Sequence, residues 1–206
     1  MTDLAFRPLQ SEDVKRCAEL HLQAFPDFFL SQLGPRFLRE FYRGFLDDPD
    51  AVTVVAETAG GDVTGVVVGT LEPRGFFSRL LKRRFVGFAA ATALAVLRRP
   101  SRLPRLVRGL VYRGQVPLDV GGALLSSICV DPRAQSRGTG TELITRFEAI
   151  VRSCEMGAYL VTDHVDNDSA NAFYLRSGWK LAGEYDTTEG RRMNCYVLLA
   201  REDHHE

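Results

Sequence analysis

Two kinds of apolar pattern alternate along the chain. Apolar residues spaced three and four apart predict amphipathic helices, and short apolar runs between turn residues predict strands. The helical spacing predicts helices over residues 11–26, 35–46, 141–154 and 170–177. Short apolar runs predict strands over residues 4–8, 52–57, 63–71, 124–130, 159–162, 180–185 and 193–200. Turn residues at 59–62 and 189–190 predict two hairpins among these strands.

The order of these segments predicts the fold class. A helix over residues 141–154 connects the strands at 124–130 and 159–162, and such a crossover makes the two strands parallel neighbours. A chain of 206 residues fits one domain. We therefore expect a single α/β domain over residues 1–206 with a mixed sheet. Within the second strand of the first hairpin, Gly65 and Gly69 suggest a bulge or a close approach of another group.

Residues 73–118 differ in composition from the rest of the chain. They hold eleven Arg or Lys residues and no Asp or Glu. Helical patterns over residues 76–87 and 89–111 indicate a helical insertion between two strands. Three interpretations stay open: a solvated helical pair whose arginine stems cover apolar surface, an anion-receiving wall over an acceptor site, or peripheral contact with a membrane. We favour the first two together.

Global properties limit the other function classes. The net charge is zero, so we expect no overall attraction to nucleic acid. Four scattered cysteines without a CxxC pair indicate reduced thiols and argue against a structural metal. The first residues lack the pattern of a secretory signal, and the longest nearly apolar run is shorter than the ~20 residues of a spanning helix. We expect a cytoplasmic protein, either a monomer or a homodimer.

A glycine-containing loop joins the strand at 124–130 to the helix that follows. It reads Gln135-Ser-Arg137-Gly138-Thr139-Gly140. Glycine lets main-chain N–H groups approach a ligand closely, and the unpaired N–H groups at a helix start attract anions such as a pyrophosphate. The loop is not a P-loop, because no Lys-Ser/Thr pair follows, and it lacks the three-glycine spacing of a dinucleotide fingerprint.

A second segment lies at the next predicted helix. It reads Asn167-Asp-Ser-Ala170-Asn-Ala-Phe173-Tyr174-Leu-Arg-Ser-Gly178-Trp179. The first loop resembles the Q/R-x-x-G-x-G/A motif of the Gcn5-related N-acetyltransferase (GNAT) superfamily, and this segment resembles that family's Asn-x-x-Ala-x-x-Phe-Tyr-x-x-x-Gly-aromatic signature. The resemblance covers residues 124–200 strongly and residues 3–71 by the order of elements. It does not cover residues 73–118.

The resemblance implies a twisted, mostly antiparallel sheet flanked by helices, and an acetyl-CoA-dependent N-acetyltransferase. The implied acceptor is a primary amine of a small molecule, for which the basic insertion suggests a nucleotide-linked amino sugar. Two alternatives stay open: acetylation of a protein N-terminus or lysine, and a non-catalytic CoA-binding regulatory module. No metal is implied.

Site roles follow from the same resemblance. Main-chain groups of Ile128 and Val130 are expected to pair with the pantetheine arm of CoA. Asn167 is expected to bond the pantetheine, and Tyr174 to protonate the departing thiolate as general acid. The pyrophosphate is expected at the glycine loop and helix start, over Gln135, Arg137, Gly138, Thr139, Gly140 and Thr141.

The general base is not visible in the sequence. Many relatives place a glutamate on the strand assigned to residues 124–130, and this strand carries no carboxylate. Asp163 and His164 are the expected catalytic alternatives, with Glu184 or a water relayed by Ser126 or Ser127 also open.

An aromatic cluster follows the first helix, where this superfamily usually builds its acceptor pocket. The expected substrate-binding residues are Asp27, Phe28 and Phe29, with Ser127 from the central strand. Asp27 is the carboxylate there that would receive an amine. Plain hydrophobic packing between two helices explains the phenylalanines equally well.

Overall fold

The computed structural model describes residues 4–26, 28–98, 117–134, 138–165, 167–187 and 190–200, with residues 29 and 94–98 described by their backbone alone. In this described part, seven strands form one sheet. Their order across the sheet is β1 (Leu4–Arg7), β2 (Ala51–Thr58), β3 (Val63–Thr70), β4 (Ala123–Val130), β5 (Ala158–Asp163), β7 (Arg192–Leu198) and β6 (Lys180–Asp186).

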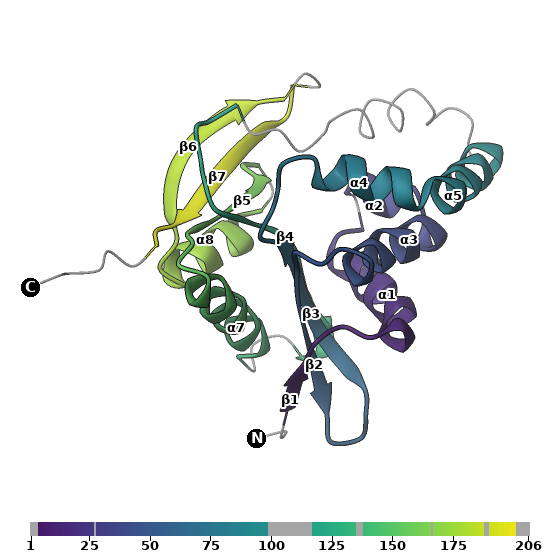
Figure 1. The fold of residues 1–206 in the computed structure, drawn as a ribbon, viewed down its shortest axis with the longest axis horizontal. Helices are drawn as coiled ribbons and strands as arrows, with labels where there is room; N and C mark the ends of the chain where they lie inside the picture. The colour runs from purple at the N-terminus through teal and green to yellow at the C-terminus, as the bar shows by residue number, and fades with distance from the viewer. Residues whose placement is uncertain are drawn as a thin grey trace, which may run out of the picture.

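Helices cover both faces of this sheet (Figure 1). The chain enters through η1 (Ser11–Asp13), α1 (Val14–Ala24), α2 (Phe29–Gln32) and α3 (Pro35–Leu46). Between β3 and β4 lie α4 (Phe76–Arg83) and α5 (Phe85–Arg98), and after β4 come η3 (Pro132–Ala134), α7 (Thr139–Ser153) and α8 (Asp168–Arg176).

Strand pairing confirms the expected mixed, mostly antiparallel sheet. The pair β4–β5 is parallel, and the other five neighbouring pairs are antiparallel. The helical insertion is also confirmed over its described part, but its division is not where the sequence placed it. The break falls at Arg84, the C-cap of α4, because α5 starts at Phe85 and runs through the predicted gap at residue 88. The part of the predicted second helix beyond Arg98 lies outside the described residues.

Two apolar cores lie on opposite faces of the sheet. One joins β2, β3 and β4 to α1, α3, α4 and α5, with buried residues such as Leu20, Tyr42, Phe45 and Phe76. The second joins the sheet to α7 and α8, with buried residues such as Phe147, Leu160 and Trp179. We call these the acceptor face and the cofactor face respectively, after the binding sites that the sequence predicts for them.

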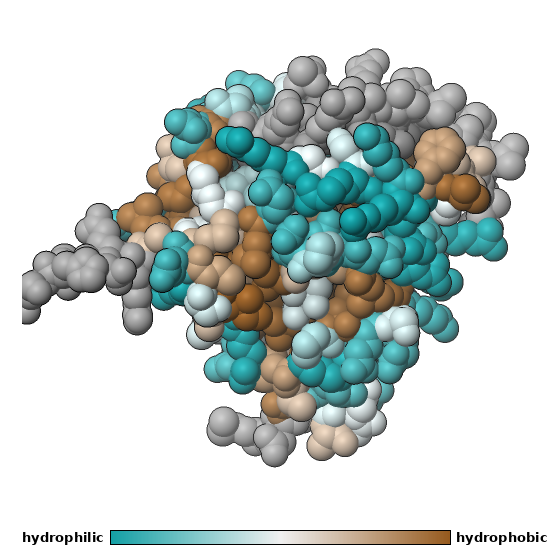
Figure 2. Space-filling view, in the orientation of Figure 1, coloured by the Kyte–Doolittle hydropathy of each residue, from teal (hydrophilic) through white to brown (hydrophobic). Residues whose placement is uncertain are grey.

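The arginines of the insertion contact acids of α3 and of the residues just after it. Arg79 lies 3.4 Å from the Asp48 carboxylate, and Arg84 lies 2.7 Å from Glu40 and 2.6 Å from Asp47. The opposite side of α4 and α5 is apolar, and Phe76, Leu80, Phe88 and Ala91 are buried in the acceptor-face core. Hydrophilic side chains accordingly gather over α4 in Figure 2. The insertion is therefore packed on α3 rather than attached loosely beside it.

Candidate active site

The parallel strands β4 and β5 separate after a short contact. They pair at Ala123–Ala158 and Leu124–Tyr159 only. Beyond this point β4 is paired with β3 through Val130, and β5 is paired with β7 through Asp163. The edge of β4 that faces β5 therefore presents main-chain N–H and C=O groups to an extended ligand, at the positions where Ile128 and Val130 were predicted to bind.

A bulge in β4 divides the side chains of this strand between the two faces. Val68 of β3 pairs with Ser127 and Gly69 pairs with Leu125, so Ser126 is the extra residue. Leu125 lies in the cofactor-face core. Ser127 instead contacts α1 on the acceptor face. The close approach expected at Gly69 is confirmed, because a Cβ there would lie 2.3 Å from the Leu124 carbonyl oxygen.

The start of α7 lies beside the end of β4. Gly138 is the N-cap and has a φ of 82°, in the left-handed region that favours glycine. A Cβ at Gly140 would lie 3.7 Å from both Val130 and Phe173, so the first turn of α7 packs between β4 and α8. The two sequence motifs are thus brought together at the carboxyl end of β4, beyond the two residue pairs that it forms with β5. Unpaired N–H groups of this turn fit an anion.

Asn167 and Tyr174 lie on α8 at the same side of the sheet. Asn167 is the N-cap, but its side chain makes no capping hydrogen bond and donates from Nδ2 to Thr162 Oγ1 of β5. Its alternative explanation as a simple helix cap is therefore wrong. Tyr174 is buried against Phe173, Trp179 and Tyr196. Burial raises the pKa of Tyr174 above its ordinary value, which keeps the phenol protonated at neutral pH.

His164 belongs to a hydrogen-bond network on this cofactor face. Asn171 Nδ2 donates to the Asp163 carbonyl oxygen, so Asn171 Oδ1 accepts from Asn194 Nδ2 at 3.1 Å. Asn194 Oδ1 then lies 2.8 Å from His164 Nδ1, which must be the donor. The network thereby assigns neutral His164 the Nδ1–H tautomer and leaves Nε2 as the proton-accepting nitrogen.

Asp163 lies on the opposite face from its neighbour, as alternate residues of a strand do. Its carboxylate accepts hydrogen bonds from the guanidinium of Arg191, which lies in the turn just before β7. The guanidinium of Arg191 also lies 5.8 Å from the centre of the Phe28 ring. Arg191, which the sequence did not single out, thus joins two predicted site residues, Asp163 and Phe28. Glu184, the other carboxylate considered, is paired with Arg192.

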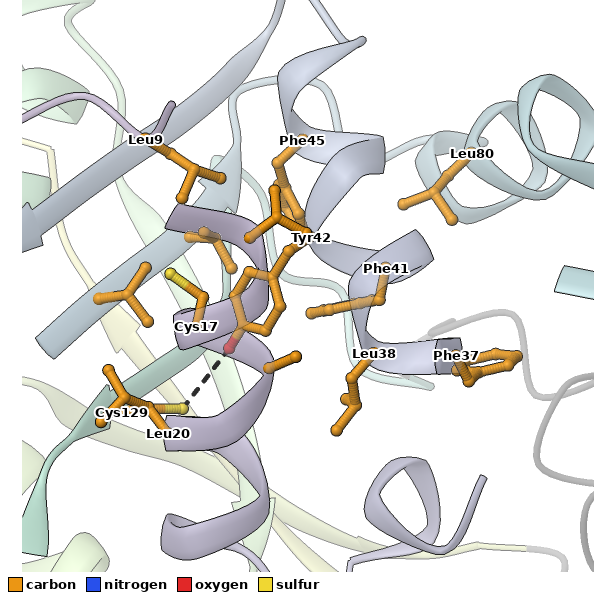
Figure 3. Close-up of a cluster of buried hydrophobic side chains, with 14 of the residues drawn as sticks. Leu9, Cys17, Leu20, Phe37, Leu38, Phe41, Tyr42, Phe45, Leu80 and Cys129 are labelled. Atoms are coloured by element: carbon orange, nitrogen blue, oxygen red, sulfur yellow. Dashed lines mark hydrogen bonds between the residues drawn. The ribbon is translucent and has the colours of Figure 1, made fainter. Parts of the chain in front are cut away.

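A buried polar cluster on the acceptor face was missed. His21 Nδ1 lies 3.1 Å from Tyr42 Oη and 3.5 Å from Ser127 Oγ. Ser127 Oγ and Tyr42 Oη also contact Cys129 Sγ, at 3.4 Å and 3.6 Å, and Figure 3 shows the second of these contacts among the apolar side chains. The sequence carried a signal, because His21 continues the apolar spacing of Cys17 and Ala18 in α1 and so had to face the core.

The aromatic residues after α1 gather around His21. Its ring lies 5.1 Å from that of Phe25, 6.3 Å from that of Phe28 and 6.1 Å from that of Phe41, measured between centroids. Phe28 and Ser127, both predicted as substrate-binding residues, therefore lie close to the same side chain, His21. Asp27, Gln135 and Arg137 lie outside the described residues, as does the side chain of Phe29.

Among the residues that the structure describes, no group of three or more His, Cys, Asp or Glu side chains is placed to hold a metal ion. No helix in the described ranges is both long and apolar enough to cross a membrane.

Comparison with known proteins identifies the family. The model of the acetyltransferase (GNAT) family matches residues 14–179. Ard1 from Thermoplasma volcanium has a similar solved structure, with a TM-score of 0.61 at 15% identity over 97% of this chain and 99% of that one. The ribosomal-protein-S18-alanine N-acetyltransferase from Escherichia coli gives 0.57 at 16% identity over 99% of each chain. NAA60 from Arabidopsis thaliana, solved with a bisubstrate analogue, gives 0.59 at 16% identity over 96% of this chain and 98% of that one.

A search of the curated proteins found no match. At these identities the solved structures show the shared fold alone. The family model covers most of the chain, and the chain therefore belongs to the acetyltransferase (GNAT) family. Its members are acetyltransferases that use acetyl-CoA, so this protein is an acyltransferase.

Proposed function

We propose that this protein is an acetyl-CoA-dependent N-acetyltransferase that acts on a primary amine of a small molecule. The observation that carries the proposal is the separation of β4 from β5 beside the start of α7. A free strand edge fits the amide-containing pantetheine arm, and the helix start fits the pyrophosphate. Both features occur at one end of the sheet, as binding of a single CoA molecule requires.

The chain supplies groups for each part of that cofactor. We propose that Ile128 and Val130 bind the pantetheine through their main chain, and that Asn167 adds a side-chain contact. Main-chain N–H groups of Gly138, Thr139, Gly140 and Thr141 would hold the pyrophosphate, with Gln135 and Arg137 contributing from the preceding loop. Acetyl-CoA would supply the acetyl group as a thioester.

Tyr174 is proposed as the general acid. Its burial on the cofactor face keeps its proton available at neutral pH, which a donor to a departing thiolate requires. Of the predicted proton acceptors, Asp163 is held by Arg191, and His164 offers Nε2 from the cofactor face. We propose that Asp163 orients Arg191 at the acceptor side, and we retain His164 as a candidate base to be tested below.

A small acceptor is supported by the contacts across the acceptor face. Arg191 reaches from the β6–β7 turn to Phe28, next to α2, and joins the two sides of that face. Such a bridge favours a compact acceptor over an extended peptide. The specific suggestion of a nucleotide-linked amino sugar loses support, because Arg79, Arg83 and Arg84 of the insertion are paired with acids of the chain itself.

Two measurements test the proposal. Release of free CoA from acetyl-CoA, followed over a panel of small amines and peptides, should show turnover with a small amine. Tight binding of acetyl-CoA without turnover on any amine would instead support the non-catalytic module. Turnover confined to peptides would support the protein acetyltransferase.

The acid role is tested on the active enzyme. Tyr174→Phe should lower kcat by about 100-fold with little change in the KM for acetyl-CoA, because only the proton donor is lost. Tyr159→Phe is the matched control, since Tyr159 of β5 is equally buried at 8% exposure and has no proposed role. Equal rates for both variants would remove Tyr174 from the mechanism.

A further inference from the structure

His21 is a buried histidine that lacks a full set of partners. Its side chain lies in the last turn of α1 and is 2% exposed. Nε2 is enclosed and has no hydrogen-bond partner among the described residues, while Nδ1 faces the hydroxyls of Tyr42 and Ser127. Buried polar groups are almost always paired, so an unpaired ring nitrogen calls for an explanation. Packing alone would be served better by an apolar side chain.

The cluster lies where the acceptor must approach. Ser127 is the first residue after the β4 bulge and faces away from α7 and α8, on the opposite side from Tyr174. It belongs to the part of β4 whose edge is not paired with β5. An amine that reaches a thioester held along this edge from the acceptor face would therefore meet the Ser127 hydroxyl.

The reaction needs a proton acceptor at this position. When an amine attacks a thioester, its nitrogen must lose a proton, and β4 offers no carboxylate to receive it. A serine hydroxyl alone is a weak base, but it can accept a proton while it passes its own to an imidazole. The distance of 3.5 Å between Ser127 Oγ and His21 Nδ1 is of the loose kind common in enzymes without bound substrate.

We propose that Ser127 and His21 form the proton path for the acceptor amine, with Tyr42 holding the imidazole ring. This inference rests on the proposed N-acetyltransferase function. As the C–N bond forms, the nitrogen gives a proton to Ser127 Oγ, and Ser127 gives its own proton to His21 Nδ1. As the C–S bond breaks, Tyr174 protonates the sulfur. After product release His21 loses one proton to solvent and Tyr174 regains one, so the enzyme returns to its starting state.

The surroundings of His21 suit a ring that must start neutral. Burial lowers the pKa of His21 to about 4, so the ring is neutral near pH 7, and in the tautomer with its proton on Nε2 the Nδ1 atom can accept one. Its titratable neighbours are Tyr42 and Cys129, with Cys17 close to Tyr42, and burial raises the pKa of Cys129 to about 11. Tyr42 Oη lies 3.1 Å from Nδ1 and can donate to it in the resting ring; when Ser127 delivers a proton, the Tyr42 hydroxyl turns toward Cys129 Sγ and accepts from the new Nδ1–H.

Matched variants separate proton transfer from positioning. His21→Asn keeps a polar atom near the place of Nδ1 but cannot take a proton, and Ser127→Ala removes the hydroxyl. Each should lower kcat by about 100-fold, with the KM for acetyl-CoA unchanged. The double variant should lose no more than either single variant, because both interrupt one path. Cys17→Ala, in the same buried core but without a part in the path, should keep its kcat.

Calorimetric binding of acetyl-CoA and thermal melting show whether each variant folds, and Ser127→Ala carries the test if His21→Asn does not. Full activity in folded His21→Asn or Ser127→Ala overturns the inference while the proposed function stands. Additive losses in the double variant, or a large loss confined to His164→Asn, also overturn it. If the wild-type protein turns over no amine at all, the proposed function fails and the proton path with it.

Discussion

The two faces of the sheet use different chemistry for their proposed tasks. On the cofactor face, α7 and the edge of β4 present main-chain groups, and their position depends on glycines and on strand pairing. On the acceptor face, α1, α3 and β4 each bring a side chain into one buried polar cluster. Side-chain substitutions should therefore leave the first face largely intact, whereas backbone restrictions should damage it. The second face should respond in the opposite way.

The largest expected effect is at Gly69 of β3, which packs against α7 on the cofactor face. A Cβ at this position would lie 2.3 Å from the Leu124 carbonyl oxygen and 2.5 Å from the Phe147 ring of α7. Gly69→Ala should therefore lower the free energy of unfolding by about 3 kcal/mol, because backbone and a buried ring must both move. Urea unfolding followed by circular dichroism measures it.

Gly60→Ala is the control for Gly69→Ala. It lies in the β2–β3 turn, where a Cβ would meet only Thr58 Oγ1 at 3.7 Å. Its stability should stay within about 0.5 kcal/mol of the wild-type protein. Similar values for the two variants would show that the packing of α7 on β3 does not limit the fold.

The next effect concerns pH and should be confined to the acceptor face. Because burial lowers the pKa of His21 to about 4 from 6.5, the unfolded chain binds more protons than the folded one between these values. Stability is therefore complete above pH 6.5 and decreases as the pH falls. From pH 7 to pH 5 the loss due to His21 should be about 2 kcal/mol.

This pH effect is measured by urea unfolding at both pH values. The difference in the free energy of unfolding between the two pH values should become smaller in His21→Asn by that amount. Tyr159→Phe, altered at a buried side chain whose pKa is raised further above this range, should retain the wild-type difference. A pH difference that is unchanged in His21→Asn would mean that the ring is not desolvated in solution.

The smallest effect separates folding from binding on the cofactor face. Gly138→Ala should cost about 1 kcal/mol of stability, because an alanine at a φ of 82° is strained. Gly140→Ala meets only ordinary contacts at 3.7 Å and should fold normally. If the first turn of α7 binds the pyrophosphate, Gly140→Ala should still raise the KM for acetyl-CoA about 10-fold, with the KM for the amine unchanged. An unchanged KM for acetyl-CoA would remove Gly140 from the binding site.

The elements of the cofactor face could be predicted from the sequence for a physical reason. Binding through main-chain groups requires glycines and a helix start at fixed spacing, so Gly138, Gly140 and Asn167 lie in two short motifs. The local period of apolar residues also predicted most strands and the helices that cover them. These features depend on residues that are close together in the sequence, and for this reason they can be predicted without a structure.

The acceptor face depended on contacts between distant segments. The hydrogen bond of His21 to Tyr42 and its approach to Ser127 span 21 and 106 residues of sequence. The bulge at Ser126 leaves no mark in the apolar pattern of β4, so the side chosen by Ser127 could not be predicted. Likewise, the composition of the insertion did not show that Arg79 and Arg84 pair with Asp48, just after α3, and with Glu40 within it.

The single extra residue in β4 has a consequence for how such enzymes change over time. Deleting Ser126 would restore strict alternation, because Leu125 and Ser127 already face opposite sides of the sheet. The Ser127 side chain would then stay on the acceptor face, and β4 would lose only the local bend that the extra residue produces. A family could therefore gain or lose this residue without moving the Ser127 side chain from one face to the other.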